Sequence, residues 1–312
     1  MDKRLAAHHT RPVDLLMTLA GFGVGAVVGL TGMGGGALMT PLLVLAFGVP
    51  PLAAVSSDLV ASAVMKPFGG WVHARRGTVN WELVRWLCVG SVPAAFAGVL
   101  LTRLLPGDES VQHAIQYALG AALVLAAVGL IAKARAAQRA PAGATAQPIV
   151  VRPLPTALLG AGGGVIVGLT SVGSGSLIIV ILLALYPALR PNDLVGTDLV
   201  QAVPLVGAAA LGHALFGDLH LDIAGAILLG SVPGVLLGAR FSSRAPAGVV
   251  RAALVVVLLT SALKMFGAPN ALVLVVAAAA ITIAIVVGVR ARASSTTAAP
   301  VEPPILAKTG AE

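Results

Sequence analysis

Two short clusters of glycine, serine and threonine lie inside otherwise apolar stretches of the chain. The first glycine cluster, residues 31–36, reads Thr-Gly-Met-Gly-Gly-Gly, and the second, residues 170–175, reads Thr-Ser-Val-Gly-Ser-Gly. Such residues weaken a helix, and a helix that restarts after them presents unpaired N–H groups and the positive end of its dipole. Successive glycine N–H groups can also bind an anion. We therefore expect a site for a small anion, with these candidate ligands: Thr31, Gly34, Gly35, Gly36, Thr170, Gly173, Ser174 and Gly175.

The alternative is that both clusters serve only close helix packing, a common role of glycine in membranes. Packing rarely needs three consecutive glycines, so we favour the site. The spacing Gly32-x-Gly34-x-x-Ala37 also fits part of a dinucleotide-binding fingerprint. It follows an apolar run and not the strand of a βαβ unit, so no dinucleotide site is expected.

Asp58 and Asp198 occupy equivalent places after the two clusters, early in an apolar element. Carboxylates at membrane depth are costly and usually functional, so these two can carry a coupling proton or hold the wall of a cavity. A helix cap near the membrane interface is an equally good interpretation, because Pro50 and Pro51 shortly precede Asp58. Neutral hydrogen bonds to an oxyanion are expected from Ser57, Thr197 and Gln201.

Three further polar residues recur in or near these elements. Lys66 could attract an anion or hold a structural or proton-coupling charge, but we favour a side chain that snorkels to the cytoplasmic face. His73 and His213 could relay protons, but a position at the membrane interface is favoured. The remaining histidines lack metal-ligand spacing, and no nucleophile–base pair is apparent. We expect no metal, no cofactor and no enzymatic activity.

The composition places these residues in a membrane. Apolar residues make up 58% of the chain and charged residues 10%, with a mean hydropathy of +0.98, whereas soluble domains carry about 25% charged residues. The long apolar runs predict helical spans and not the alternating strands of a barrel. The net charge of +8 comes from Lys and Arg between the runs, which is the positive-inside pattern and does not indicate nucleic acid. The predicted class is an all-α, polytopic integral membrane protein.

The chain also repeats itself. Residues 21–31 resemble 160–170 at an offset of 139, and residues 57–98 resemble 197–238 at an offset of 140 after a one-residue insertion. The tetrapeptide Gly-Ser-Val-Pro at 90–93 is identical to that at 230–233. This many matches at one spacing indicates a duplication, so we predict two homologous halves.

Each half contains five apolar elements. They are expected at about 14–31, 36–49, 52–72, 83–105 and 112–134, and again at about 155–170, 175–188, 193–215, 222–240 and 249–266. The second element of each half, about 14 residues or roughly 21 Å of helix, is too short for a hydrocarbon core of about 30 Å. We therefore expect each cluster to join the arms of a hairpin that turns inside the membrane, followed by about three spans.

These elements define the predicted organisation of the chain. It comprises a first transmembrane repeat (14–134), a basic cytoplasmic linker (135–153), a second transmembrane repeat (154–267), an extra span (268–290) and a disordered tail (291–312). With hairpins, the loop and tail Lys and Arg, without Lys66 and the distal Lys308, divide 13 inside to 5 outside when the halves are inverted and the N-terminus is outside. Parallel halves give 11 to 7. The positive-inside rule therefore favours inverted repeats.

At these residues the chain resembles the TauE/SafE sulfite exporter family, whose members are often described as probable membrane transporter proteins. The resemblance rests on residues 29–36 with Pro41-Leu42-Leu43, on residues 72–81 and on Val195-Gly196-Thr197-Asp198-Leu199. It extends to about Phe266 and implies export or import of sulfite, sulfate or organosulfonates, coupled to protons. The second cluster departs from a plain glycine run at Ser171 and Ser174, so the two sites need not be equivalent.

Together, these features predict a multi-pass secondary transporter in the plasma (inner) membrane. A small anion, such as sulfite, sulfate or a taurine-like organosulfonate, would bind between the two clusters and cross by alternating access. The sequence carries no ATP-binding motif, so a proton gradient is the expected driving force. The expected partners are this anion, the lipid bilayer and protons, and a homo-oligomer is compatible. The main alternative is a passive channel for small anions or neutral solutes, with faster flux and no proton dependence; an accessory scaffold ranks below it.

Overall fold

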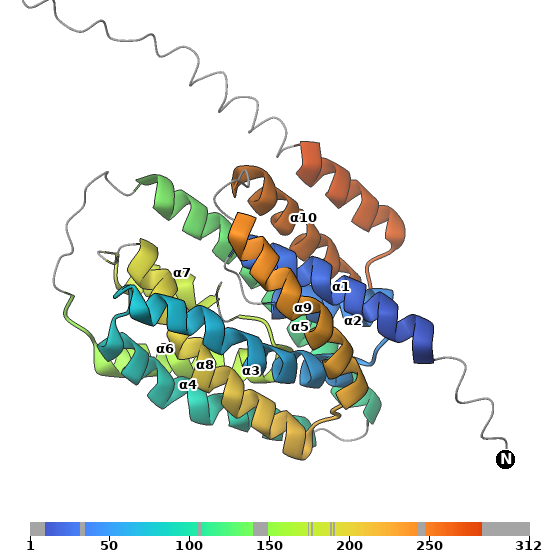
Figure 1. Cartoon of the computed structure of the whole chain (residues 1–312), viewed down its shortest axis with the longest axis horizontal. Helices are drawn as coiled ribbons and strands as arrows, with labels where there is room; N and C mark the ends of the chain where they lie inside the picture. Colours follow the sequence, from blue (N-terminus) through green and yellow to red (C-terminus); the bar gives the residue numbers. More distant parts are fainter. Residues whose placement is uncertain are drawn as a thin grey trace, which may run out of the picture.

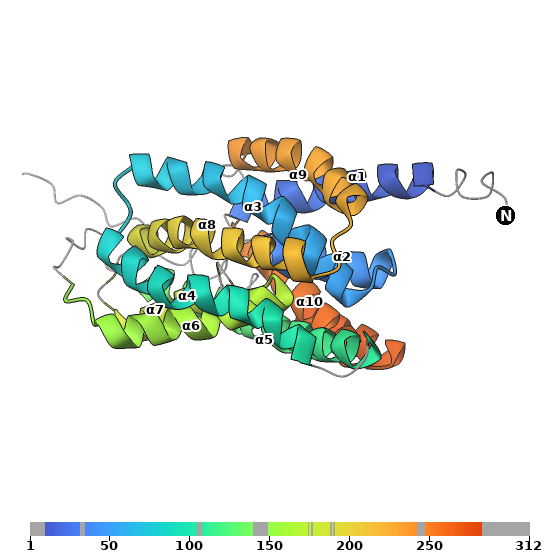
Figure 2. The same ribbon diagram turned by 90° about the horizontal axis from the view of Figure 1, so that it is seen from below.

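The computed structural model is a bundle of helices (Figures 1 and 2). It describes residues 10–31, 35–104, 108–139, 149–173, 175, 177–187, 189, 191–241 and 247–282. Within these ranges all regular elements are helical, as expected for an all-α protein, and six helices are long and apolar enough to cross a membrane.

The helices follow the predicted apolar elements closely. In chain order they are α1 (Thr10–Thr31), α2 (Gly36–Ala46), α3 (Pro51–Arg75), α4 (Trp81–Leu101), the 3-10 turn η1 (Thr102–Leu104), α5 (Asp108–Arg139), α6 (Pro153–Thr170), α7 (Leu177–Leu185), α8 (Pro191–Phe216), α9 (Leu221–Phe241) and α10 (Ala247–Met265). A further apolar helix covers Asn270–Thr282, within the predicted extra span.

Some predicted boundaries are wrong. α5 continues to Arg139, five residues into the expected linker, because its Ala-rich sequence favours a helix. The short arms are shorter than expected, with 11 residues in α2 and 9 in α7. α3 has 25 residues but carries Asp58 and Lys66, and it is not among the six candidate spans. Residues 140–148, 283–290 and the predicted tail lie outside the described residues.

Glycines set the closest helix contacts. α1 packs along α9, where Gly25 lies against the backbone of Ser231 and Gly234 lies against that of Phe22. A Cβ atom on Gly21 would lie only 2.9 Å from the carbonyl oxygen of Ile227, so a larger residue would force the helices apart. Residue numbers rise together along this contact, so α1 and α9 run parallel (Figure 2).

α4 and α6 repeat this arrangement on the other side of the bundle. Gly164 of α6 lies against the backbone of Ser91, and Gly168 lies against that of Ala95. Gly90 of α4 lies in turn against Ala157. These two helices also run parallel, and close approach between small residues is the usual way to join helices in a membrane.

The central helices α3 and α8 run antiparallel. Near one end of their contact Ser56 bonds to His213, and toward the other Gly70 lies against Val203. α5 and α10 are antiparallel as well, since Gln116 bonds to the carbonyl of Met265 while Lys133 interacts with Arg251. Figure 2 shows α8 between α3 and α4, so α8 lies inside the bundle.

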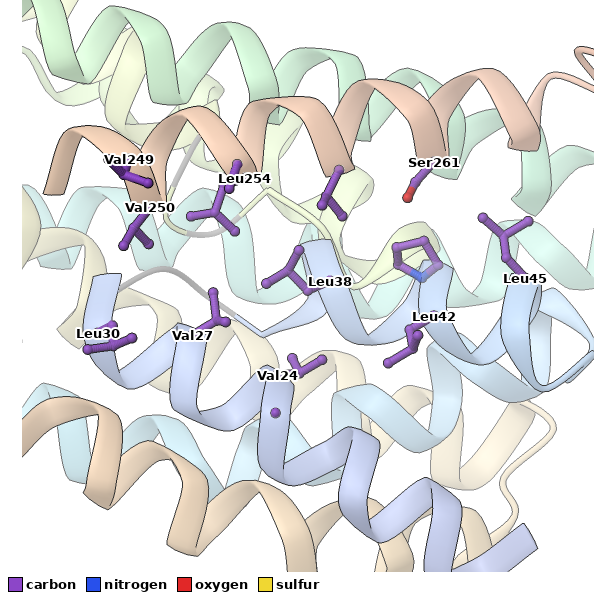
Figure 3. A pocket seen from close by; sticks show the side chains of 14 residues that line it. Val24, Val27, Leu30, Leu38, Leu42, Leu45, Val249, Val250, Leu254 and Ser261 are labelled. Atoms are coloured by element: carbon purple, nitrogen blue, oxygen red, sulfur yellow. The ribbon is translucent and has the colours of Figure 1, made fainter. Parts of the chain in front are cut away.

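α2 turns back beside α1. In Figure 3 residues Val24, Val27 and Leu30 follow one another along α1 in the direction opposite to Leu38, Leu42 and Leu45 along α2. Together with α10 these helices line a groove of about 540 Å³. Its described lining is almost entirely aliphatic, and among these residues only Ser261 bears a hydroxyl.

Candidate functional site

The first glycine cluster separates helix α1 from helix α2. Thr31 ends α1, and its hydroxyl donates back to the carbonyl of Val27 at 2.7 Å. Gly35 precedes α2, and its carbonyl accepts the N–H groups of Leu38 and Met39. Gly34 lies outside the described residues. The cluster therefore ends one helix and begins the next, as expected.

In the second cluster, residues with left-handed backbone separate α6 from α7. Ser171 has a φ of 59°, and Gly175 has a φ of 103°, which side chains rarely adopt. The hydroxyl of Thr170 donates to the carbonyl of Ile166 at 2.6 Å and accepts the N–H of Val172. Gly173 lies between these turns at a φ of 129°, and Ser174 lies outside the described residues.

The two clusters touch each other. Gly36, the first residue of α2, lies against the backbone and hydroxyl of Ser171, and no space remains there for a Cβ atom. Asp58 of α3 fastens this contact, because one of its oxygens, Oδ2, accepts the hydroxyl of Ser171 at 2.6 Å and that of Thr40 at 2.9 Å. Asp58 thus joins its own half of the chain to the glycine cluster of the other half.

Asp198 of α8 meets the second cluster differently. It accepts the backbone N–H of Gly175 and interacts electrostatically with Lys66 of α3 and Lys133 of α5. Its side chain is 1% exposed, and its Oδ1 oxygen has no hydrogen-bond partner among the described residues. Oδ1 of Asp58 is buried without such a partner as well.

The helix-cap interpretation of the two aspartates is wrong. α3 begins at Pro51 and α8 at Pro191, so both carboxylates lie more than a full turn inside their helices. Both side chains are at most 1% exposed. Buried carboxylates without a capping role are what a functional or internally structural assignment requires.

Lys66 is partly exposed, so the favoured snorkelling interpretation stays a prediction. Its ammonium group interacts with the buried Asp198 and, less strongly, with Asp58. Lys133 completes the group, and sequence reasoning missed it. It lies near the end of an apolar run, shortly before Arg135 and Arg139, so the sequence does not distinguish it from the basic residues of the predicted linker. No local signal shows that it interacts with the buried Asp198 of α8.

The expected neutral oxyanion ligands point elsewhere. Ser57 donates to the carbonyl of His220 at 3.3 Å, and the hydroxyl of Thr197 accepts the N–H of Asn80 at 3.0 Å. Both hydroxyls therefore hold the loop before a following helix. Gln201 donates to the hydroxyl of Ser91 at 2.7 Å, while its buried Oε1 has no partner among the described residues.

The two histidines differ in burial and in hydrogen bonding. His73 lies partly exposed in the last turn of α3 and bonds to Thr78 at 2.9 Å. His213 is fully buried, which contradicts the interfacial interpretation. Its Nε2 atom donates to the carbonyl of Gly168 at 2.7 Å, and its Nδ1 atom bonds to Ser56 at 2.8 Å. It thereby satisfies a carbonyl at the end of α6, just before the second cluster.

Comparisons with known proteins agree with this architecture. Residues 17–265 match the family described as Sulfite exporter TauE/SafE. The chain is 38% identical over 255 residues to the probable membrane transporter protein YjnA of Bacillus subtilis (strain 168), covering 81% of this chain and all of that protein. It is 26% identical over 244 residues to YdhB of the same organism, a probable membrane transporter protein, covering 77% and 95%. No solved structure matches the chain.

The family match covers most of the chain, and the relatives are transporters and not enzymes. The candidate spans make the protein a multi-pass membrane protein. This chain belongs to the TauE/SafE family of membrane transporters.

Proposed function

We propose that this protein is a secondary transporter for a small sulfur-containing oxyanion or organosulfonate, such as sulfite, sulfate or a taurine-like compound. The substrate would bind where the two glycine clusters meet and cross by alternating access. The observation that carries this proposal is the contact of Gly36 with Ser171, fastened by the buried Asp58. This contact brings together two helix interruptions that lie far apart in the sequence.

Broken helices at membrane depth support a binding site at this point. Non-helical backbone is tolerated there only where it is buried in protein or lines a cavity. Helix ends that face such a cavity offer N–H groups to an anion. The proposed backbone ligands are Gly34, Gly35, Gly36, Gly173, Ser174 and Gly175, and Thr31 and Thr170 shape the turns through their hydrogen bonds.

The two halves, residues 14–134 and 154–267, are proposed to be inverted repeats that each begin with a hairpin inside the membrane. The antiparallel courses of α3 against α8 and of α5 against α10 support this, because each pair joins elements at equivalent places in the repeated sequence. α2 and α7 are too short to cross alone. Inverted repeats let a transporter rock around one site at the membrane midplane.

Proton coupling is the proposed driving force, with Asp58, Asp198 and Lys66 as candidate groups. Carboxylates buried in a membrane protein are commonly proton carriers. A passive channel for small anions is the other candidate, and it would show fast downhill flux without proton dependence. The buried, oppositely charged groups around the clusters favour the coupled transporter.

The test is uptake of radiolabelled sulfite, sulfate and taurine into proteoliposomes, with and without an imposed pH gradient. Accumulation of one compound that depends on the gradient is the expected result. Downhill flux that does not depend on the pH gradient would contradict the coupled transporter and support the passive channel. Absence of flux for all three compounds, with the protein correctly inserted, would contradict the proposed substrate class.

A further inference from the structure

His213 of α8 links α3 to the end of α6. Its Nε2 atom lies 2.7 Å from the carbonyl oxygen of Gly168, and its Nδ1 atom lies 2.8 Å from the hydroxyl oxygen of Ser56 in α3. That hydroxyl oxygen also lies 2.7 Å from the carbonyl oxygen of Leu52. The imidazole ring is fully buried. Three short polar contacts therefore form one continuous chain through α6, α8 and α3.

These three contacts need three hydrogens, and the neutral groups supply only two. A neutral imidazole carries one N–H, and Ser56 carries one O–H. With the ring hydrogen on Nε2, Ser56 donates either to Nδ1 or to Leu52, and the other contact has no hydrogen. With the ring hydrogen on Nδ1, the lone pair of Nε2 faces the carbonyl oxygen of Gly168. An imidazolium donates from both nitrogens while Ser56 donates to Leu52, so only the protonated ring satisfies all three contacts.

The carbonyl of Gly168 needs a donor because α6 ends close by. In a continued helix this carbonyl would accept the N–H of Val172, four residues farther on. That N–H is bonded instead to the hydroxyl of Thr170 at 3.1 Å, inside the second cluster. His213 therefore supplies the hydrogen bond that the interrupted helix lacks. The same bond attaches α8 to the segment that leads into the second cluster.

The groups around the ring are neutral. Besides the hydroxyl from α3 and the carbonyl from α6, Val99 and Phe96 of α4 lie against the preceding residue, Gly212. Gly217 is so close that a Cβ atom on it would lie 2.7 Å from Nδ1. Within the described parts of the chain, no charged side chain acts on the ring. A buried charge without an ion-pair partner is costly, so the ring keeps a second proton only while the three contacts hold.

The first half of the chain offers an internal comparison. His73 occupies the place equivalent to His213, is partly exposed and bonds to Thr78 at 2.9 Å. Gly196 stands where α3 has Ser56, and glycine has no hydroxyl. The same chain of three contacts therefore cannot form in the equivalent place.

We propose that His213 is a further proton-binding site, and that the proton bound there holds the end of α6 against α3 and α8. This proton stays on the ring and does not travel with the substrate, in contrast to a proton carried by an aspartate. Its loss leaves one of the three contacts without a hydrogen, so the end of α6 separates from α3 and α8 more readily. Only the effect of this change on the transport rate rests on the proposed function.

Nitrogen-15 NMR of the histidine-labelled, full-length protein in detergent tests the proton site directly. The shifts distinguish a neutral ring from an imidazolium, and the His213 signal is the one that disappears in His213→Gln. We expect this ring to become doubly protonated as the pH falls through the range of about 8 to 5. A ring that stays neutral throughout this range would overturn the inference.

A pair of neighbouring serines sharpens this test. Ser56→Ala removes the acceptor of the Nδ1–H group and should weaken proton binding to His213 by about tenfold, because a hydrogen bond to a charged group is lost. The matched control is Ser57→Ala, which removes the adjacent hydroxyl that donates to the carbonyl of His220 at 3.3 Å. It should leave the titration of His213 unchanged. Unchanged proton affinity in Ser56→Ala would contradict the three-contact argument.

Exchange of labelled sulfate between vesicles and medium at equal pH on both sides measures the effect on transport. Wild-type exchange should slow as this common pH falls, because the protonated ring holds α6 in place. His213→Gln should lose this slowing, since an amide keeps an N–H for Gly168 but does not take up a proton. The control is His220→Gln, because the side chain of His220 is 48% exposed and should not affect the slowing.

The outcomes separate this inference from the proposed function. The same slowing in His213→Gln, or none in the wild type, would overturn the inference and leave the transporter proposal intact. If the wild type exchanges none of the three anions, the proposed function fails. The NMR titration of His213 then decides the proton site alone.

Discussion

Asp58 and Asp198 are the same residue in two copies of one sequence pattern, yet their surroundings differ. Asp58 accepts hydroxyls from Thr40 and Ser171, so it is held by neutral donors. Asp198 accepts a backbone N–H and interacts electrostatically with two lysines. Hydrogen bonds from hydroxyls hold a carboxylate in position. A carboxylate that interacts with cations, in contrast, competes with any entering anion for those cations.

Three substitutions between the halves explain this difference. Ser171 stands where the first cluster has Gly32, and Thr40 stands where the second half has Ile179 or Val180. Lys66 stands where the second half has Val206. The two copies of the sequence pattern thus contain one carboxylate that joins the clusters and one that interacts with cations.

The largest effect is expected at the junction of the clusters. Gly36→Ala should abolish uptake, because its Cβ atom would collide with the backbone of Ser171 and separate the clusters. Gly162→Ala in α6 is the control, since its Cβ atom would have nothing within 4 Å. Uptake into proteoliposomes checks both. Normal flux in Gly36→Ala would show that the contact is dispensable.

The two aspartates should separate in their pH profiles. Asp198→Asn is expected to remove the dependence of uptake on the pH gradient, because it removes a buried carboxylate whose Oδ1 has no hydrogen-bond partner among the described residues. Asp58→Asn keeps an acceptor oxygen for Ser171 and Thr40 and should retain that dependence. Initial rates of sulfate uptake across a pH series measure both. The reverse pattern would exchange the roles assigned to the two residues.

The hydrogen bond between the halves should contribute mainly to stability. Ser171→Ala should lower the free energy of unfolding by about 1–3 kcal/mol, because it leaves the buried Asp58 short of a donor. Ser171→Gly should cost less, since glycine accepts the φ of 59° without strain. Thermal unfolding in detergent compares them. Equal losses in both variants would mean that the backbone conformation contributes nothing.

Much of the fold could be predicted from local features of the sequence. Prolines at 51, 153 and 191 begin α3, α6 and α8, and the two clusters end α1 and α6 at the predicted Thr31 and Thr170. These signals act within a few residues, so they can be interpreted without knowledge of the tertiary structure. The burial of Asp58 and Asp198 agrees with only one of the two interpretations that their place in apolar runs left open.

Contacts between the halves could not be predicted in this way. Ser171 bonds to Asp58, and Lys133 interacts electrostatically with Asp198, because segments distant in the sequence meet in one bundle. Ser57 was expected beside Asp58 in the site, but consecutive residues of a helix point about 100° apart. Ser57 therefore faces the carbonyl of His220 while Asp58 faces the clusters.

The smallest effect is expected at these outward-facing hydroxyls. Ser57→Ala and Thr197→Ala each remove one hydrogen bond to loop backbone and should cost about 0.5–1.5 kcal/mol of stability. Their apparent affinity for sulfate should equal that of the wild type, because neither hydroxyl faces the clusters. Thermal unfolding and concentration-dependent uptake measure the two quantities. A tenfold loss of affinity at unchanged stability would instead return Ser57 and Thr197 to the anion site, and the comparison of the two aspartates would then have to include them.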